Sequence, residues 1–320
     1  MAMNVKPVPT LDDEVNEIRL ATADIVNQDI VPNEGKLWGW LSDSANAPNE
    51  VIEEARELRH QVQDKVKKAS LWAPHLPPEF GGMGLSFMQH AYMNEILSYS
   101  PGAASLFGVV APNSGNQKIL VKYGTPDQHE KWLKPLTEGR MQSGFSMTEP
   151  HNPGSDPRSL QTKAVLDGDE WVINGHKWFA SNAKAADFAI VMCRTEADDG
   201  EGGVNDKMTQ IIVPTDAPGF EVVRSVPVWD HTGGHHGEII LDDVRVPLDN
   251  ALGRSGSGHQ AAQDRLGAGR VYHCMNCIGQ MWRAFDMRVR RSMEREVHRI
   301  LIAKNVLKKY HAGESWDFGI

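Results

Sequence analysis

Apolar residues in the first 140 positions recur at three- and four-residue spacing, which is typical of amphipathic helices. Val15, Ile18 and Ile25 mark one such helix, and the apolar positions from Val51 to Val66 mark a second with a charged opposite face. This stretch shows no strand-like alternation. We therefore predict an N-terminal domain made entirely of helices, residues 1–140.

The pattern changes near Ser143 to short apolar runs separated by turn residues. Asp167-Gly168 and Asn174-Gly175 each suit a two-residue hairpin, because both central positions of such a turn need positive φ. The later apolar runs are Phe188 to Cys193, Gln210 to Val213, Phe220 to Val223 and Glu238 to Leu241. Together they predict a compact β domain, a sandwich or a barrel, over residues 141–252.

A third region, residues 253–320, opens with a glycine-rich linker and becomes helical from about His259 to Arg291. A shorter amphipathic segment follows through Tyr310. The linker lacks the glycine order of a dinucleotide-binding turn, and no strand ends on it. The predicted fold class is thus α+β, with helical, β and helical regions in that order.

Composition narrows the class of protein. The net charge is −9 and no basic stripe is interleaved with aromatic residues, which argues against a nucleic-acid partner. We find no run of eighteen apolar residues and no targeting pattern at the N-terminus, so we expect no membrane span and a cytoplasmic protein. Cys274 and Cys277 form a C-x-x-C within a helical pattern, which favours buried structural thiols over redox chemistry.

Two segments carry the candidate chemistry. Residues 145–156 form a turn rich in small residues, where glycine at 154 would let backbone N–H groups approach phosphate oxygens. Residues 174–182 end a second strand with aromatic side chains and the Ser181 hydroxyl, which could bond a ring nitrogen. The pair of segments predicts a flavin site.

These motifs, with Thr148-Glu149-Pro150 in the first and Asn-Gly-x-Lys in the second, resemble the acyl-CoA dehydrogenase family. The resemblance extends to residues 123–128, 133–136 and 243–247, so it covers nearly the whole chain. Residues 270–275 are similar to the subgroup of animal family members ten and eleven. The resemblance implies a helical domain, a β domain and a C-terminal four-helix bundle, with FAD between the last two. It also implies α,β-dehydrogenation of an acyl-CoA, with electrons passed to electron-transferring flavoprotein.

Site residues follow from the same resemblance. It implies eight cofactor-binding positions: Phe145, Met147 and Thr148 facing the isoalloxazine, Gly154 and Ser155 at the pyrophosphate, and Phe179, Ala180 and Ser181 beside the ring. Arg270 falls where the family has an arginine on its CoA-binding helix, although a solvated arginine would look the same. Gly267 and Gly269 beside it each cost a helix about 1 kcal/mol, which close approach of a ligand would explain.

The sequence does not identify the catalytic residue. The family reaction needs a carboxylate base near the α-carbon of the substrate. One family position for it corresponds to Gly269, and the other falls near Ser292, where the first bundle helix runs straight into the family's last helix. That join indicates an internal deletion and a truncated C-terminal helical bundle. Glu294 and Glu296 are the carboxylates nearest the join, and as first-turn acids they are more typical of helix-dipole partners.

Three hypotheses therefore remain open. The chain is an acyl-CoA dehydrogenase, a catalytically silent FAD- or CoA-binding partner subunit in a homo- or hetero-oligomer, or a non-functional truncated product. Glu95 could border the acyl cavity, or it could be an exposed helix carboxylate.

A metal site is a further hypothesis from the sequence. His231, His235, His236 and Glu238 cluster within eight residues, but adjacent histidines on a strand point to opposite faces. We predict no metal site there.

Overall fold

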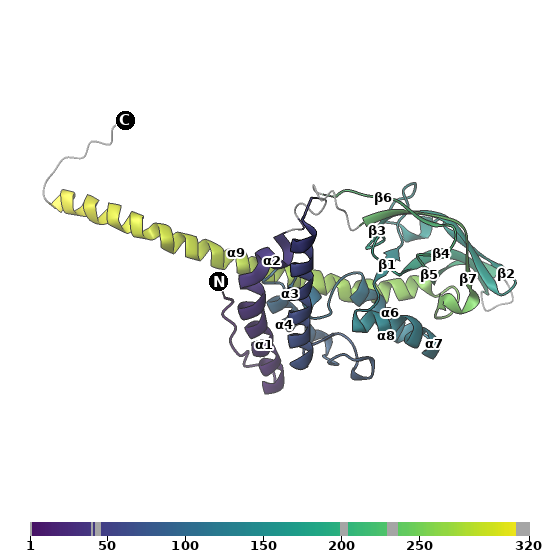
Figure 1. Cartoon of the computed structure of the whole chain (residues 1–320), viewed down its shortest axis with the longest axis horizontal. Coiled ribbons are helices and arrows are strands. Elements are labelled where there is room, and N and C mark those ends of the chain that lie inside the picture. The colour runs from purple at the N-terminus through teal and green to yellow at the C-terminus, as the bar shows by residue number, and fades with distance from the viewer. Residues whose placement is uncertain (1, 40, 42–45, 199–203, 229–235, 312–320) are drawn as a thin grey trace, which may run out of the picture.

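The computed structural model describes residues 2–39, 41, 46–198, 204–228 and 236–311, and Figure 1 shows the whole chain. A helical domain comes first, a β domain follows, and one long helix returns past both. The predicted order of helical, β and helical regions is confirmed.

The regular secondary structure of the N-terminal domain is helical across its described residues, as predicted. Its longer helices are α1 (Asp13–Ile25), α3 (Asn49–Lys68), α4 (Phe87–Leu97) and α6 (Asn113–Tyr123). Shorter elements connect them: η1 (Val26–Ile30), η2 (Val31–Asn33), α2 (Glu34–Trp38), η4 (Pro78–Phe80), α5 (Ala103–Leu106), α7 (Pro126–Gln128), η5 (His129–Leu133) and α8 (Lys134–Glu138).

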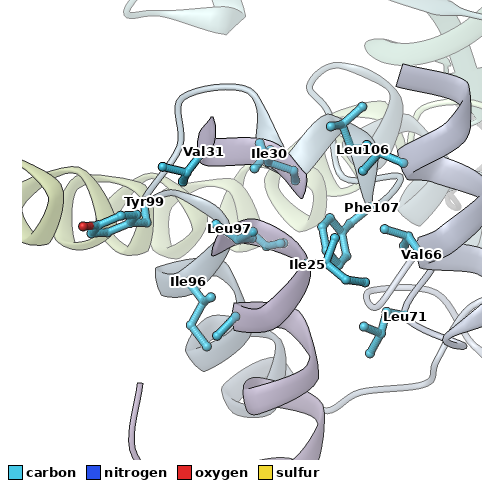
Figure 2. Close-up of a cluster of buried hydrophobic side chains, with 14 of the residues drawn as sticks. Ile25, Ile30, Val31, Val66, Leu71, Ile96, Leu97, Tyr99, Leu106 and Phe107 are labelled. Atoms are coloured by element: carbon cyan, nitrogen blue, oxygen red, sulfur yellow. The ribbon is translucent and has the colours of Figure 1, made fainter. Parts of the chain in front are cut away.

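The core of this domain collects the apolar faces that the periodicity predicted. Ile25 and Val66 come from α1 and α3, and Ile96 and Leu97 from α4, all buried in one cluster (Figure 2). Phe107 is fully buried between them. A Ser86 capping box starts α4, because the Ser86 and Gln89 side chains each bond the other's backbone amide. This cap anchors the start of α4, a helix that also lines the cavity described below.

The eight strands join in one mixed sheet rather than in two separately hydrogen-bonded sheets. They are β1 (Ser143–Ser146), β2 (Lys163–Asp167), β3 (Glu170–Ser181), β4 (Phe188–Asp198), β5 (Val204–Pro214), β6 (Phe220–Ser225), β7 (His236–Pro247) and β8 (Ala251–Leu252). The order is β6-β7-β3-β1-β4-β5-β8, with β2 pairing both β3 and β4. Short 3₁₀ turns, η6 (Pro157–Ser159) and η7 (Leu248–Asn250), complete the domain.

One prediction within this sheet is wrong. Asn174-Gly175 does not turn a hairpin but lies inside β3, where an irregularity in the pairing with β7 falls between Ile173 and Gly175. Glycine is needed there for close approach, since a Cβ on residue 175 would fall 2.3 Å from the Thr162 hydroxyl oxygen. A hairpin does connect β2 and β3, but its two-residue loop is Gly168-Asp169, because Asp167 is the last residue of β2 and pairs with Glu170. Of the two loop residues, Gly168 has the positive φ, 63°.

The last element, α9 (Gly258–His311), is a single helix of 54 residues. The sequence predicted two segments, but no glycine or proline between Arg291 and His311 interrupts the helix. Its first half packs on α4 and α6. Gly279 allows this contact, because a Cβ there would lie 2.3 Å from the Glu95 carbonyl oxygen.

Beyond Asp286, whose carboxylate accepts a 2.8 Å hydrogen bond from the Tyr99 hydroxyl, α9 projects away from the body (Figure 1). Six apolar side chains on this part are more than a third exposed: Met287, Val289, Met293, Ile300, Leu301 and Leu307. Glu95 is half-buried on α4, and its carboxylate accepts a 2.7 Å hydrogen bond from the Trp282 indole. None of the described helices is both long and apolar enough to cross a bilayer.

Candidate functional site

The two predicted motifs meet at neighbouring strand ends. β1 pairs with β3 at Phe145 and Ser181. Just beyond, the Thr148 hydroxyl donates to the Trp178 carbonyl at 2.8 Å, and the Trp178 amide donates back to the Thr148 carbonyl at 3.1 Å. Segments that are about thirty residues apart in the chain therefore form one continuous edge.

A buried ion pair fixes this edge. Lys177 and Glu149, whose side chains are 0% and 3% exposed, approach to 2.9 Å, and the Lys177 ammonium also donates to the Met147 carbonyl at 2.9 Å. The Glu149 carboxylate further accepts from the Thr162 amide at 2.9 Å and hydroxyl at 2.6 Å, the Gln161 amide at 2.6 Å and the Asn152 side chain at 2.6 Å. The strand end and the turn after it are thus tied to β3 and to the start of β2.

The charge on this carboxylate is strongly favoured. Burial raises the pKa of Glu149, but the Lys177 charge and the Thr162 and Gln161 donors outweigh it and lower that pKa to about 2. The sequence identified both residues as parts of family motifs without giving either a role. The available signal was a lysine within a predicted strand, beside apolar and aromatic residues.

The eight predicted cofactor positions lie at this end of the sheet. Met147 and Thr148 are half-buried and Phe179 is 42% exposed, whereas the side chains of Phe145 and Ala180 are buried. Gly154 and Ser155 are exposed in the turn after Glu149, and a Cβ on Gly154 would lie 3.5 Å from the Thr148 methyl. Only their contact with a flavin stays a prediction.

The geometry of Phe179 fits a planar ligand. A bulge in the β3–β7 pairing between Lys177 and Ala180 turns this ring outward, with φ at 48°. That conformation costs a non-glycine residue about 1 kcal/mol or more and is concentrated at ligand sites. Trp178 flanks the ring at 4.8 Å between centroids, and the Ser181 hydroxyl lies on the same edge, 3.4 Å from His236 Nδ1. An exposed aromatic side chain, a hydroxyl and an open glycine turn could receive the ring, a ring nitrogen and the phosphates of FAD.

A cavity of about 280 Å³ lies between α4, α6 and the first turns of α9. Arg270 and Gly269 line it, as the resemblance implied for a CoA-binding helix. A Cβ on Gly269 would have nothing within 4 Å, so the glycine leaves open space. Among the residues that the structure describes around this cavity, none is Asp or Glu.

Arg265 connects the cavity to the strand-end site, and the sequence reasoning missed it. Its side chain lines the cavity and its guanidinium carbon lies 3.9 Å from the centroid of the Phe145 ring. Arg265 Nε donates to Asn116 Oδ1 at 3.0 Å, and Asn116 in turn donates to the Ser143 hydroxyl and the Gly144 carbonyl. The one available signal was its place on the helix, five residues before Arg270.

Neither sequence position for a catalytic base supplies one. Gly269 has no side chain, and Ser292 lies 22 residues along α9 from Arg270, about 33 Å at 1.5 Å per residue. The helix positions of Glu294 and Glu296 are farther still. Within one chain, no carboxylate from this part of α9 can reach the cavity.

Two sequence interpretations concern metal and thiol chemistry. Cys274 and Cys277 are exposed, so the prediction of buried thiols is wrong for both, whereas Cys193 is buried. They face away from the packed side of α9, which the three-residue spacing alone did not reveal.

His231 and His235 lie outside the described residues. Glu238 is engaged by His176 at 2.8 Å and Arg224 at 2.6 Å, and no metal-binding group is found among the described residues.

The fold and the site define an α–β–α protein with a strand-end cradle for a planar cofactor and an adjoining cavity under its last helix. Two family models match the chain: "Acyl-CoA dehydrogenase, N-terminal domain" over residues 12–140 and "Acyl-CoA dehydrogenase, middle domain" over residues 144–244. The chain belongs to the acyl-CoA dehydrogenase family.

Individual relatives agree. Acyl-CoA dehydrogenase family member 10 of Mus musculus is 34% identical over 89% of this chain and 27% of its own length. A probable acyl-CoA dehydrogenase of Mycobacterium tuberculosis is 38% identical over 75% of this chain and 59% of its own length. A solved acyl-CoA dehydrogenase-like structure from Mycobacterium abscessus superposes with a TM-score of 0.76 at 33% identity, covering 88% of this chain and 70% of that one. This chain therefore spans only part of the curated relatives that it matches.

Proposed function

We propose that this chain binds FAD at the ends of β1 and β3 and an acyl-CoA in the cavity beside Arg270, as an acyl-CoA dehydrogenase-type flavoprotein. The observation that carries the proposal is Arg265, which lines the cavity and covers the Phe145 ring of the predicted flavin strand. The substrate and cofactor sites are therefore neighbours, as they must be if the reacting atoms are to approach to about 3–3.5 Å for hydride transfer.

Each part of the site has a role in this proposal. Bound FAD supplies the hydride acceptor for α,β-dehydrogenation. Thr148, Phe179 and Ser181 hold and orient the ring, the open turn at Gly154 admits the phosphates, and Arg270 binds the CoA portion. Family resemblance supports electron-transferring flavoprotein as electron acceptor, a role in fatty-acid metabolism and an oligomeric state. A cytoplasmic location stays a prediction of the sequence.

Removal of the α-proton is the weak step. A positioned general base contributes typically 10²- to 10⁴-fold in rate. Because no carboxylate lines the described cavity, we expect turnover by the isolated chain to fall short by about that factor. This observation favours a second candidate function, a protein that binds FAD and acyl-CoA without dehydrogenating it.

The test begins with the stoichiometry of bound flavin on the purified chain, followed by anaerobic addition of acyl-CoA. Flavin that bleaches supports the dehydrogenase, and flavin that stays oxidised while acyl-CoA binds supports the silent binder. A chain that binds neither would overturn both. Phe179→Ala should weaken flavin binding, whereas Val165→Ala, at a more exposed apolar residue on β2, should not.

A gain-of-function variant tests the missing base. Gly269→Glu places a carboxylate in the open space beside the cavity and should speed bleaching by 10-fold or more. Gly267→Glu is the matched control, because that position is equally open on the same helix but does not line the cavity. Equal rates in the two variants would contradict the proposed substrate position.

A further inference from the structure

Arg265 carries a charge that the described protein does not neutralise. Its Nε donates a hydrogen bond to the neutral Asn116 side chain, and no described carboxylate forms an ion pair with it. Burial lowers its pKa to about 10, which still leaves the guanidinium charged at neutral pH. A half-buried arginine of this kind normally has an anionic partner.

The guanidinium is held in place before any ligand binds. The Phe145 ring covers one face, and Asn116 fixes the Nε edge. Gly115 makes room for it, since a Cβ there would lie 2.9 Å from Arg265 Nε. A side chain already held by these two contacts loses little entropy when an anion binds to its remaining N–H groups.

Other polar groups stand among the apolar side chains of the cavity wall, and none of the described ones is an acid. The His75 and His90 rings stack with centroids 5.8 Å apart, and His75 Nδ1 and His90 Nε2 are buried without a hydrogen-bond partner among the described residues. Lys118 and Arg270 add positive charge. Burial, with Lys118 nearby, lowers the pKa of His75 to about 4 and of His90 to about 3, so both imidazoles are neutral near pH 7.

We propose that the cavity selects an acyl-CoA whose acyl group ends in a negatively charged substituent, a carboxylate being the simplest, and that Arg265 is the residue that binds it. The inference rests on the proposed function, because it takes the acyl-CoA to occupy this cavity. A plain hydrocarbon chain would cover Arg265 and the two unpartnered imidazole nitrogens without bonding any of them, which costs affinity.

The experiment compares acyl groups of equal length on the full chain loaded with FAD. Calorimetry measures the affinity of succinyl-CoA against butyryl-CoA, and of glutaryl-CoA against pentanoyl-CoA. The carboxylated member of each pair should bind about 10- to 100-fold more tightly, the range expected for a charged, bidentate hydrogen bond. This comparison needs no variant, so it does not depend on any substitution folding.

Variants then assign the effect to Arg265. Arg265→Met should abolish the preference, and it should bind butyryl-CoA at least as tightly as wild type because no charge is then covered, which also shows that the variant is folded. Arg265→Lys keeps the charge without the planar fork and should retain part of the preference. Arg288→Met, on the exposed part of α9, is the control and should behave as wild type.

The outcomes separate the two proposals. Equal affinity within both pairs, or a preference that survives in Arg265→Met, would overturn the role of Arg265 and leave the acyl-CoA site intact. Failure of all four thioesters to bind would overturn the proposed function, and this inference with it.

Discussion

Replacing Glu149 by Gln should destabilise the β domain severely, although the two side chains have nearly the same shape. One carboxylate oxygen accepts from Lys177 and from both donors of Thr162, and the other accepts from the Gln161 amide and the Asn152 side chain. An amide NH₂ in the second place would face two N–H donors instead of accepting from them. Lys177 would also keep a buried charge with no opposite charge beside it.

The loss of folding stability in Glu149→Gln can be worked out in two independent ways. Breaking a buried ion pair by removing one partner costs about 3–5 kcal/mol. Separately, lowering the pKa of Glu149 from 4.5 to about 2 corresponds to about 3 kcal/mol of preference for the charged, folded state. The two agree, so we expect the free energy of unfolding to fall by about 3–5 kcal/mol at neutral pH.

The pH dependence has a definite sign. Because the folded-state pKa lies below the ordinary value, the contribution of Glu149 is complete above pH 4.5 and is lost as the pH falls toward 2. Urea unfolding of wild type and Glu149→Gln at pH 7, 5 and 3 measures this, and the gap between them should narrow at pH 3. Glu138→Gln, which removes a surface partner of Arg140, is the control and should change little. A Glu149→Gln protein as stable as that control at pH 7 would refute the reasoning.

Two further predictions follow from single contacts. Gly175→Ala should lower the midpoint of thermal unfolding strongly and weaken flavin binding, because its Cβ would displace Thr162 and through it Glu149. Gly168→Ala, at an open turn, should lower the midpoint less, and equal losses would contradict the close-approach role of Gly175. A thiol reagent should titrate Cys274 and Cys277 in the native protein and Cys193 only after unfolding, because burial raises the pKa of the Cys193 thiol to about 12. One reactive thiol in the native protein instead of two would contradict the exposure of the C-x-x-C.

Much of the fold was predictable because the residues within each element carry the pattern that determines it. Apolar residues at helical spacing from Val51 to Val66, with charged residues on the opposite face, predict an amphipathic helix, and α3 forms there. The hairpin near Asp167-Gly168 forms one residue later than predicted, at Gly168-Asp169, where Gly168 supplies the positive φ of a short turn. Asn174-Gly175 carries the same local signal, but tertiary contacts overrode it: Asn174 exchanges hydrogen bonds with Asp243 across β3 and β7, and Thr162 packs on the glycine.

The candidate site was predictable only where its residues are contiguous in sequence. The strand-end motifs each lie within about twelve residues, so the resemblance located them. Arg265, His75 and His90 come from separate elements and share one cavity only after α9 packs across α4 and α6. The same packing decides which side of α9 is open, which is why the exposure of Cys274 and Cys277 could not be read from a helical pattern.

The geometry of α9 also decides where a base can act. A straight helix moves each residue about 1.5 Å farther along its axis, so the Ser292 region is carried about 33 Å past the cavity that Arg270 lines. Restoring a carboxylate at the join would therefore not restore proton removal within one chain. Position 269 lies in the cavity wall with open space in front of it, so within the described part of α9 it is the place from which a carboxylate could serve the site.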